Sequence, residues 1–225
     1  TQQNGFNFCD PARGTFRRYV HDEKDANSLS SNAIYAINMD ETGKLWIGTE
    51  NGGVSILDID KNKFSTFEHD DIDKNSMDGN TIYAIYRDKF DNMWLGAFSG
   101  GINLLKHSTK SFTHYRHSSS LNSLSNDFVL DLYEDAGKNL WGGTDGGVVN
   151  VFNASNGTVK HYKHEPGNKN SLCGNYVITV NQDDAGNFWF GTWADGISIF
   201  NPKTNTFTNL KHDPANPNSL SGNNI

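Results

Sequence analysis

The stretch Leu45-Trp46-Ile47-Gly48-Thr49-Glu50-Asn51-Gly52-Gly53 decides the fold, because it occurs four times in the chain with small changes. Its tryptophan and the glycine two positions later return at steps of 48, 47 and 48 residues, as Trp46 and Gly48, Trp94 and Gly96, Trp141 and Gly143, and Trp189 and Gly191. A fixed period of about 40–50 residues is typical of proteins built from repeated structural units, propellers among them.

The rest of each period keeps the same spacing. An Asn-Ser-Leu or Asn-Ser-Met motif lies 17 residues before each tryptophan, as from Leu29 to Trp46, and a histidine follows 23 residues after it, as from Trp46 to His69. The periodic histidines are His21, His69, His117, His164 and His212. Equivalent positions on different repeats are spread around a ring, so they cannot converge on one metal ion, and we expect them to be structural.

Each period predicts four strands. Residues 34–37 form a short apolar run without alternation, so we expect both faces of this innermost strand to be buried. The tryptophan segment is the second strand, residues 54–57 the third, and residues 64–69 a more exposed fourth strand. Four short antiparallel strands per period indicate a propeller blade.

The predicted fold is therefore an all-β β-propeller of four complete four-stranded blades with parts of a further blade at the two termini. The blades span residues 32–79, 80–126, 127–174 and 175–222, with 1–31 as the end of a preceding blade and 223–225 as the start of the next. Each tryptophan is expected to pack against the neighbouring blade. The turn after the second strand is expected to be one residue shorter in the third blade.

Composition narrows the possible partners. The chain of 225 residues has a net charge of −7 and no cluster of Lys and Arg, which argues against nucleic acid as a partner. No apolar run reaches the roughly 18–20 residues of a membrane span, so we expect no direct membrane insertion of this segment. The only cysteines, Cys9 and Cys173, occupy different repeat positions and are expected to be free thiols.

The pattern Asn32-x-Ile34-x-x-Ile37-x-x-Asp40-x-x-Gly43-x-Leu45-Trp46-Ile47-Gly48-Thr49-x-x-Gly52-Gly53 resembles the two-component regulator propeller repeat. Blade 2 departs from the pattern with Ala97-Phe98 in place of Thr-x. The resemblance implies the extracytoplasmic, periplasmic sensor region of a hybrid two-component protein, within a larger seven-bladed propeller. It also implies the detection of glycan breakdown products.

Ligand-binding candidates are the residues that differ between repeats, because residues that all repeats share are expected to serve packing. The turns between the second and third strands differ most, and an exposed aromatic ring with nearby carboxylates and amides suits a carbohydrate. Packing of Phe98 and Trp193 between blades is the alternative. The candidates in these turns are Glu50, Asn51, Phe98, Asp145, Trp193 and Asp195.

Asp131 is a further candidate, because Ala36, Ala84 and Thr179 occupy its equivalent positions. A carboxylate on an innermost strand must be hydrogen-bonded or must face water. Two interpretations stay open for it, a ligand contact and a hydrogen-bonded structural role.

No metal, cofactor or catalytic residue is expected. The segment Asp71-x-Asp73-x-Asn75 resembles the start of a calcium loop, but it lacks the glycine at position six, and Ile82 stands where the bidentate glutamate belongs. No nucleophile elbow, phosphate loop or zinc spacing is present.

The function expected from the sequence is an extracytoplasmic sensor segment that responds to oligosaccharides. A glycan-active propeller enzyme using Asp131 as its acid or base is one alternative, and a protein-interaction scaffold is another. The expected partners are an oligosaccharide, other blades or domains of the same full-length protein, and a second copy in a homodimer.

Overall fold

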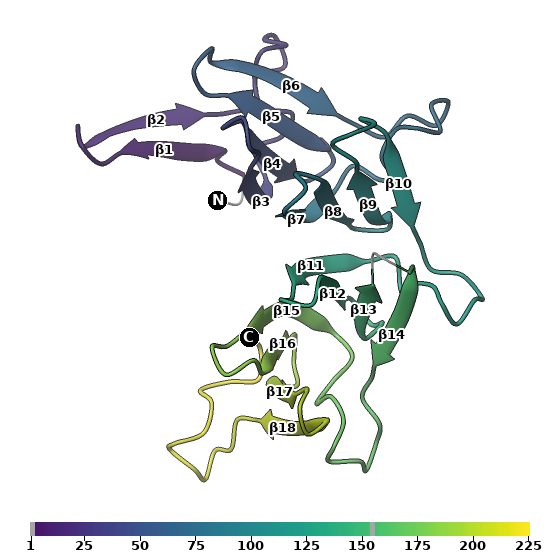
Figure 1. Cartoon of the computed structure of the whole chain (residues 1–225). Coiled ribbons are helices and arrows are strands. Elements are labelled where there is room, and N and C mark those ends of the chain that lie inside the picture. Colours follow the sequence, from purple (N-terminus) through teal and green to yellow (C-terminus); the bar gives the residue numbers. More distant parts are fainter. Residues whose placement is uncertain (1–2, 154–155) are drawn as a thin grey trace. The chain divides into compact units, whose positions relative to one another are not determined.

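The computed structural model describes residues 3–153 and 156–225, and all regular structure in these ranges is β-strand (Figure 1). Residues 1–2 and 154–155, which fall in the predicted first segment and the predicted third blade, lie outside the described residues. Because the described residues form no helix, they contain none that is long and apolar enough to cross a membrane.

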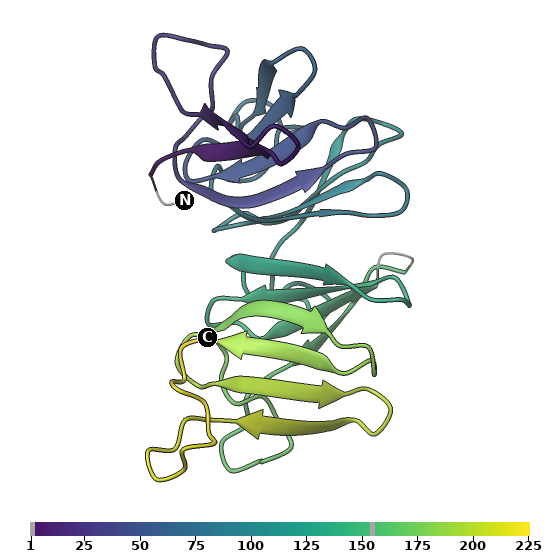
Figure 2. The same cartoon turned by 90° about the vertical axis from the view of Figure 1, so that its left-hand side faces the viewer.

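The strands form four four-stranded sheets and one two-stranded sheet, and consecutive strands of the chain are neighbours in every sheet. Figure 2 shows this order for β15, β16, β17 and β18, whose pairs are all antiparallel. Each four-stranded sheet lies inside one of the four predicted blades. The strands are β1 (Phe6–Asp10), β2 (Thr15–Tyr19), β3 (Ile34–Met39), β4 (Leu45–Thr49), β5 (Val54–Asp58), β6 (Lys63–Phe67), β7 (Ile82–Arg87), β8 (Met93–Ala97), β9 (Gly101–Leu105), β10 (Phe112–Tyr115), β11 (Val129–Glu134), β12 (Asn139–Thr144), β13 (Val149–Asn153), β14 (Thr158–Tyr162), β15 (Val177–Gln182), β16 (Phe188–Thr192), β17 (Ile197–Asn201) and β18 (Thr206–Leu210).

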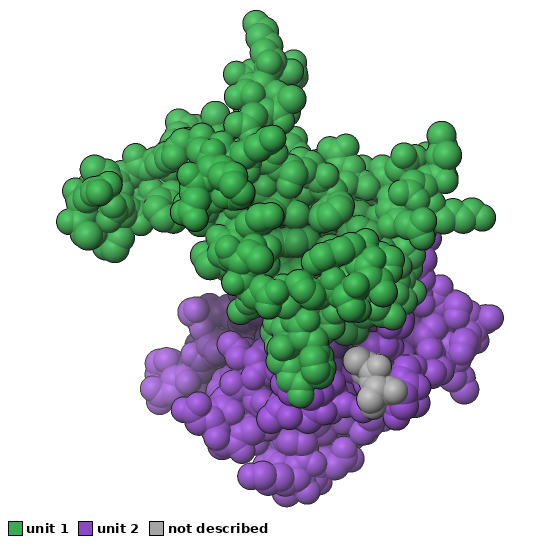
Figure 3. Space-filling model, turned by 45° about the horizontal axis from the view of Figure 1, so that its top comes forward, with its two compact units in different colours: residues 1–114 green, residues 115–225 purple. Residues whose placement is uncertain are grey.

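The chain divides into two compact units, residues 1–114 and residues 115–225, coloured separately in Figure 3. Unit 1 holds β1 and β2, the β3–β6 blade and nearly all of the β7–β10 blade. Unit 2 holds the β11–β14 and β15–β18 blades. Within each unit, successive innermost strands lie close together, β3 beside β7 and β11 beside β15. Each unit therefore shows the radial packing that the repeat predicts.

Two of the repeated tryptophans join neighbouring blades, as predicted. In unit 1, buried Trp46 shares a core cluster with Ile82 and Leu95 of the next blade. In unit 2, buried Trp141 stacks on Phe188, with 3.7 Å between the ring centroids. Each indole Nε1 also donates a hydrogen bond of about 3 Å to an aspartate six residues earlier, in the pairs Trp46–Asp40, Trp94–Asp88, Trp141–Asp135 and Trp189–Asp183.

The glycine two residues after the tryptophan is needed because the innermost strand of the next blade passes very close to it. A Cβ atom on Gly48 would lie 2.7 Å from the Ile82 carbonyl oxygen, and one on Gly143 would lie 2.7 Å from that of Val177. Real Cβ atoms do not come this near to backbone oxygens, so any larger residue would push the neighbouring innermost strand away.

Two expectations for the elements were wrong. Ile37 on β3 is 49% exposed, so this innermost strand is not buried on both faces. The sheet beside it has only the strands β1 and β2, whose apolar side chains join a cluster with Ile47 and Leu57 that does not include Ile37.

The turn of the third blade is also not shortened. Gly48 pairs with Val54 and Gly143 pairs with Val149, so both turns have the same length. The missing residue lies between His117 and Leu124, which are seven positions apart where the other repeats have eight. Length can vary in this exposed connection because it lies outside the four-stranded sheets.

The periodic histidines hold together the exposed connections that lead from one blade to the next. In each, the imidazole Nδ1 contacts the carbonyl oxygen of the leucine or methionine in the Asn-Ser-Leu or Asn-Ser-Met motif. The pairs are His21–Leu29, His69–Met77, His117–Leu124, His164–Leu172 and His212–Leu220. These contacts give the five residues the structural role expected from their spacing.

Candidate functional site

Every innermost strand has a register shift at the same repeat position, and the shift leaves one residue outside the ladder. In β3 the pairing passes from Ile34 to Ala36, and β7, β11 and β15 repeat this bulge. Bulges turn a side chain out of the regular alternation. The four residues that the pairing skips are Tyr35, Tyr83, Leu130 and Ile178.

In unit 1 the two skipped residues are tyrosines, and they stack on each other. The ring centroids of Tyr35 and Tyr83 are 4.2 Å apart with 9° between the planes. Phe98, from the turn after β8, lies on Tyr83 with a centroid distance of 5.8 Å and a tilt of 41°. We call Tyr35, Tyr83 and Phe98 the aromatic row. Phe98 remains exposed, so the row reaches the surface.

A carboxylate lies at the hydroxyl end of the row. The Tyr83 and Glu50 side chains lie near the Tyr35 hydroxyl, and the Glu50 carboxylate can only accept a hydrogen bond. Burial raises the pKa of Tyr35 to about 12, and the contacts with Tyr83 and Glu50 act in the same direction. Tyr35 is therefore a neutral donor over the whole physiological pH range.

Thr81 fixes the two turns that carry Glu50, Asn51 and Phe98. Its hydroxyl accepts from the Asn51 backbone N–H at 3.0 Å and donates to the Asn51 side-chain oxygen at 3.1 Å. Its carbonyl oxygen accepts from the Phe98 backbone N–H at 2.8 Å. Asn51 has a positive φ of 56°, which asparagine tolerates better than most residues. The turns are thus held in place before any ligand arrives.

In unit 2, Asp131 ties β11 to β15. One carboxylate oxygen accepts from the Thr179 hydroxyl at 3.0 Å and from the Val180 backbone N–H at 2.8 Å, and the other accepts from the Leu132 N–H at 2.9 Å. Burial raises the pKa of Asp131 despite these bonds. This arrangement supports the structural interpretation of Asp131, and its ligand role stays a prediction.

The remaining candidates lie on the corresponding turns of unit 2. The backbone N–H of Asp145 donates to the Phe128 carbonyl, and that of Trp193 donates to the Tyr176 carbonyl, each at 3.0 Å. Trp193 is 61% exposed. Asp195 lies 3.5 Å from the Lys211 ammonium. Their roles in binding stay predictions.

Sequence reasoning named Glu50, Asn51 and Phe98, which lie on the two turns that Thr81 joins, but it did not name Tyr35 and Tyr83. The signal was present, because the same repeat position holds Leu130 and Ile178 in the other two blades. Two tyrosines where other repeats have aliphatic residues are the kind of difference that marks a surface rather than a core.

Unit 2 also has a groove of about 490 Å³ beside Trp141, Tyr162 and Phe188. Its aromatic walls are the residues that pack one blade on the next, and its Asp135 accepts the Trp141 indole N–H at 2.9 Å. The groove is therefore mainly a gap in blade packing, and the aromatic row remains the better candidate site.

The family model described as "Two component regulator propeller" matches residues 28–51, 76–99 and 171–194. Each matched segment contains a repeated tryptophan and the innermost strand before it. The chain carries two-component regulator propeller repeats. No curated protein matches the chain in sequence.

Solved structures show the same fold for these regulator propeller repeats. The extracellular domain of a hybrid two component system protein from B. thetaiotaomicron matches with a TM-score of 0.80 and 23% identity, over 100% of this chain and 28% of that one. PorZ, a surface component of the type-IX secretion system of Porphyromonas gingivalis, matches with a TM-score of 0.70 and 17% identity, over 100% of this chain and 33% of that one. The chain thus spans about a third or less of either protein.

Proposed function

We propose that this chain is a ligand-binding segment of the extracytoplasmic, periplasmic sensor region of a hybrid two-component system, and that it binds an oligosaccharide at the aromatic row. The regulator propeller repeats support the sensor assignment, and so does the likeness to an extracellular domain of a hybrid two component system protein. The aromatic row with Glu50 is the single observation that carries the ligand assignment.

The chemistry of the row suits a sugar. Exposed Phe98 offers an apolar ring to the C–H face of a pyranose, while Tyr35 and Glu50 offer a hydroxyl and a carboxylate to its hydroxyl groups. Because the stacked tyrosines are already packed together, little side-chain entropy is lost on binding.

The test is calorimetric titration of the chain with a panel of neutral and acidic oligosaccharides. With a sugar that binds, Tyr83→Ala removes the central ring and should weaken the affinity at least roughly tenfold, a difference of about 1.4 kcal/mol. Ile178→Ala is the matched control, because Ile178 occupies the same bulge position in unit 2. An affinity unchanged by Tyr83→Ala contradicts the assignment of the site.

Trp193→Ala separates the two groups of candidates. If it weakens binding while Tyr83→Ala does not, the ligand sits on the turns of unit 2 instead. If no sugar of the panel binds, the oligosaccharide proposal fails.

The proposal contains no catalytic step. Asp131 is held by three donors, and a glycosidase would need a second carboxylate at a set distance from it. Chromatography of glycans incubated with the chain should show no product. Turnover that Asp131→Asn abolishes would favour the enzyme alternative.

A further inference from the structure

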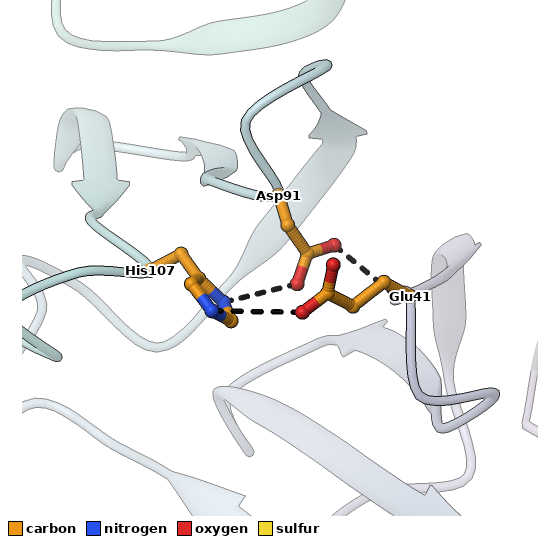
Figure 4. A group of neighbouring side chains, drawn as sticks. All are labelled: Glu41, Asp91 and His107. Atoms are coloured by element: carbon orange, nitrogen blue, oxygen red, sulfur yellow. Dashed lines mark hydrogen bonds and ion pairs between the residues drawn. The ribbon is translucent and has the colours of Figure 1, made fainter.

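A second cluster of functional groups lies in unit 1 apart from the residues of the aromatic row. Glu41 lies in the turn between β3 and β4, Asp91 in the turn between β7 and β8, and His107 just after β9. Figure 4 shows the three side chains pointing toward one another from separate loops. Their ligand atoms all lie within 4.8 Å of one another.

Asp91 is the fixed member of the cluster. Its Oδ1 accepts the Glu41 backbone N–H at 3.1 Å and lies 3.5 Å from an Arg87 nitrogen. The other oxygen, Oδ2, is directed at the His107 Nδ1, 3.1 Å away. The N–H bond to one oxygen fixes the carboxylate so that its other oxygen faces the cluster, which is how metal-binding carboxylates are oriented.

His107 and Glu41 complete the set. The His107 Nε2 is 3.5 Å from the Glu41 Oε1. The side chains of Glu41 and His107 are 54% and 40% exposed, whereas that of Asp91 is 12% exposed. The cluster therefore has a rigid carboxylate at its base and two adjustable groups open to solvent.

The repeat does not account for this cluster. Lys89, Ala136 and Asp184 stand at the repeat position of Glu41, and Gly43, Lys138 and Gly186 at that of Asp91. His107 is not one of the five periodic histidines that close the connections. The arrangement occurs on one pair of blades, so blade packing does not require it.

We propose that Glu41, Asp91 and His107 form a binding site for one zinc ion. One imidazole nitrogen and two carboxylate oxygens are zinc ligands, and three protein ligands leave a fourth position for water. His107 faces Asp91 with Nδ1 and Glu41 with Nε2, so one of these two nitrogens binds the ion and the carboxylate on the other side of the ring moves toward it. The candidate ligand atoms lie within 4.8 Å of one another, so the movement needed is small. The imidazole argues against calcium and magnesium, which prefer oxygen ligands.

The surrounding charges set the conditions for binding. Two carboxylates face the site, while the Lys110 ammonium lies 3.2 Å from the His107 Nδ1 and the Arg87 guanidinium adjoins Asp91. Zinc replaces Lys110 beside the imidazole and requires His107 to be deprotonated.

The experiment is calorimetric titration of the metal-stripped chain with zinc chloride at neutral pH, with calcium and magnesium chloride as separate titrations. One zinc per chain is expected, with little heat from the other two ions. His107→Ala and Asp91→Asn should each weaken zinc binding by roughly 10–100-fold or more. His69→Ala is the control, because His69 also contacts a carboxylate, that of Asp71 at 3.0 Å, but is not part of this cluster.

The alternative is an imidazolium held between two carboxylates without a metal. In that case zinc gives no one-to-one binding, or His107→Ala and His69→Ala reduce binding equally, and either result overturns the proposal. The oligosaccharide titrations use different residues, so the two proposals fail independently. Circular dichroism of each variant checks that the blades remain folded.

Discussion

Neighbours that are distant in the sequence change the pKa values of single residues in this chain. Tyr35 is the clearest case, since Tyr83 and Glu50 come to it from the next blade and from the next turn. A neutral phenol is favoured in such a place because burial disfavours the charged form.

Titration of Tyr35 should therefore differ from that of an ordinary tyrosine. The absorbance difference between the chain and Tyr35→Phe is expected to follow a pKa of about 12, not the usual 10.0. Because the folded-state pKa is raised, the stability that Tyr35 contributes is complete below pH 10.0 and is lost as the pH rises toward about 12. A difference spectrum that titrates near 10.0 would contradict this environment.

The pKa of Asp183 is shifted downward, whereas that of Tyr35 is raised. Hydrogen bonds from the Trp189 indole and from the Asn187 side chain and backbone lower the pKa of Asp183 from 3.8 to about 2. Its contribution to stability is therefore complete above pH 3.8 and is lost as the pH falls toward about 2. Unfolding followed against pH should show this loss in the chain but not in Asp183→Asn, and carbon-detected NMR titration of Asp183 measures the pKa directly.

At the residue scale, the sequence singled out mainly residues that break the repeat in a turn, and their role in binding stays a prediction. Glu50 and Phe98 differ from their counterparts in a segment already expected to be exposed. Tyr35 and Tyr83 lie in a run that also reads as core, and only the bulge turns them outward. A bulge depends on how the strand pairs with its neighbour, which no local pattern of residues encodes.

The blades were predictable as elements, because spacing and turn residues agree in every repeat. The exposure of β3 could not be predicted from the sequence, because it depends on how many strands the neighbouring sheet contains. Three of the four repeated tryptophans are buried, Trp141 among them, whereas Trp189 is 37% exposed.

This difference gives a matched pair of variants. Trp141→Ala and Trp189→Ala each remove one indole hydrogen bond to an aspartate, but only Trp141 also loses its stack on Phe188. Trp141→Ala should lower the free energy of unfolding by about 3–5 kcal/mol, as for other large buried aromatic residues. Trp189→Ala should cost clearly less in urea-induced unfolding. Equal losses would show that packing between blades is not the main role of Trp141.

At the scale of the whole molecule, the repeat period correctly gave an all-β propeller architecture. The division of the chain between residues 114 and 115 falls at the end of β10 and has no counterpart in the sequence pattern.

The overall charge leads to a separate prediction. The chain has 26 Asp and Glu against 19 Lys and Arg, so it lacks the positive field that attracts phosphate backbones. It should pass through heparin and DNA columns without retention at about 0.15 M salt, where screening is moderate. Retention that falls steeply with added salt would reveal a local basic surface.

The bulge shared by all four innermost strands has an evolutionary consequence. Because the skipped residue takes no part in strand pairing, mutation can exchange tyrosine for leucine or isoleucine there while the ladder stays intact. The side chain at this position can therefore change in one blade without affecting the others. A duplicated repeat brings one more such position, which mutation can change without loss of the fold.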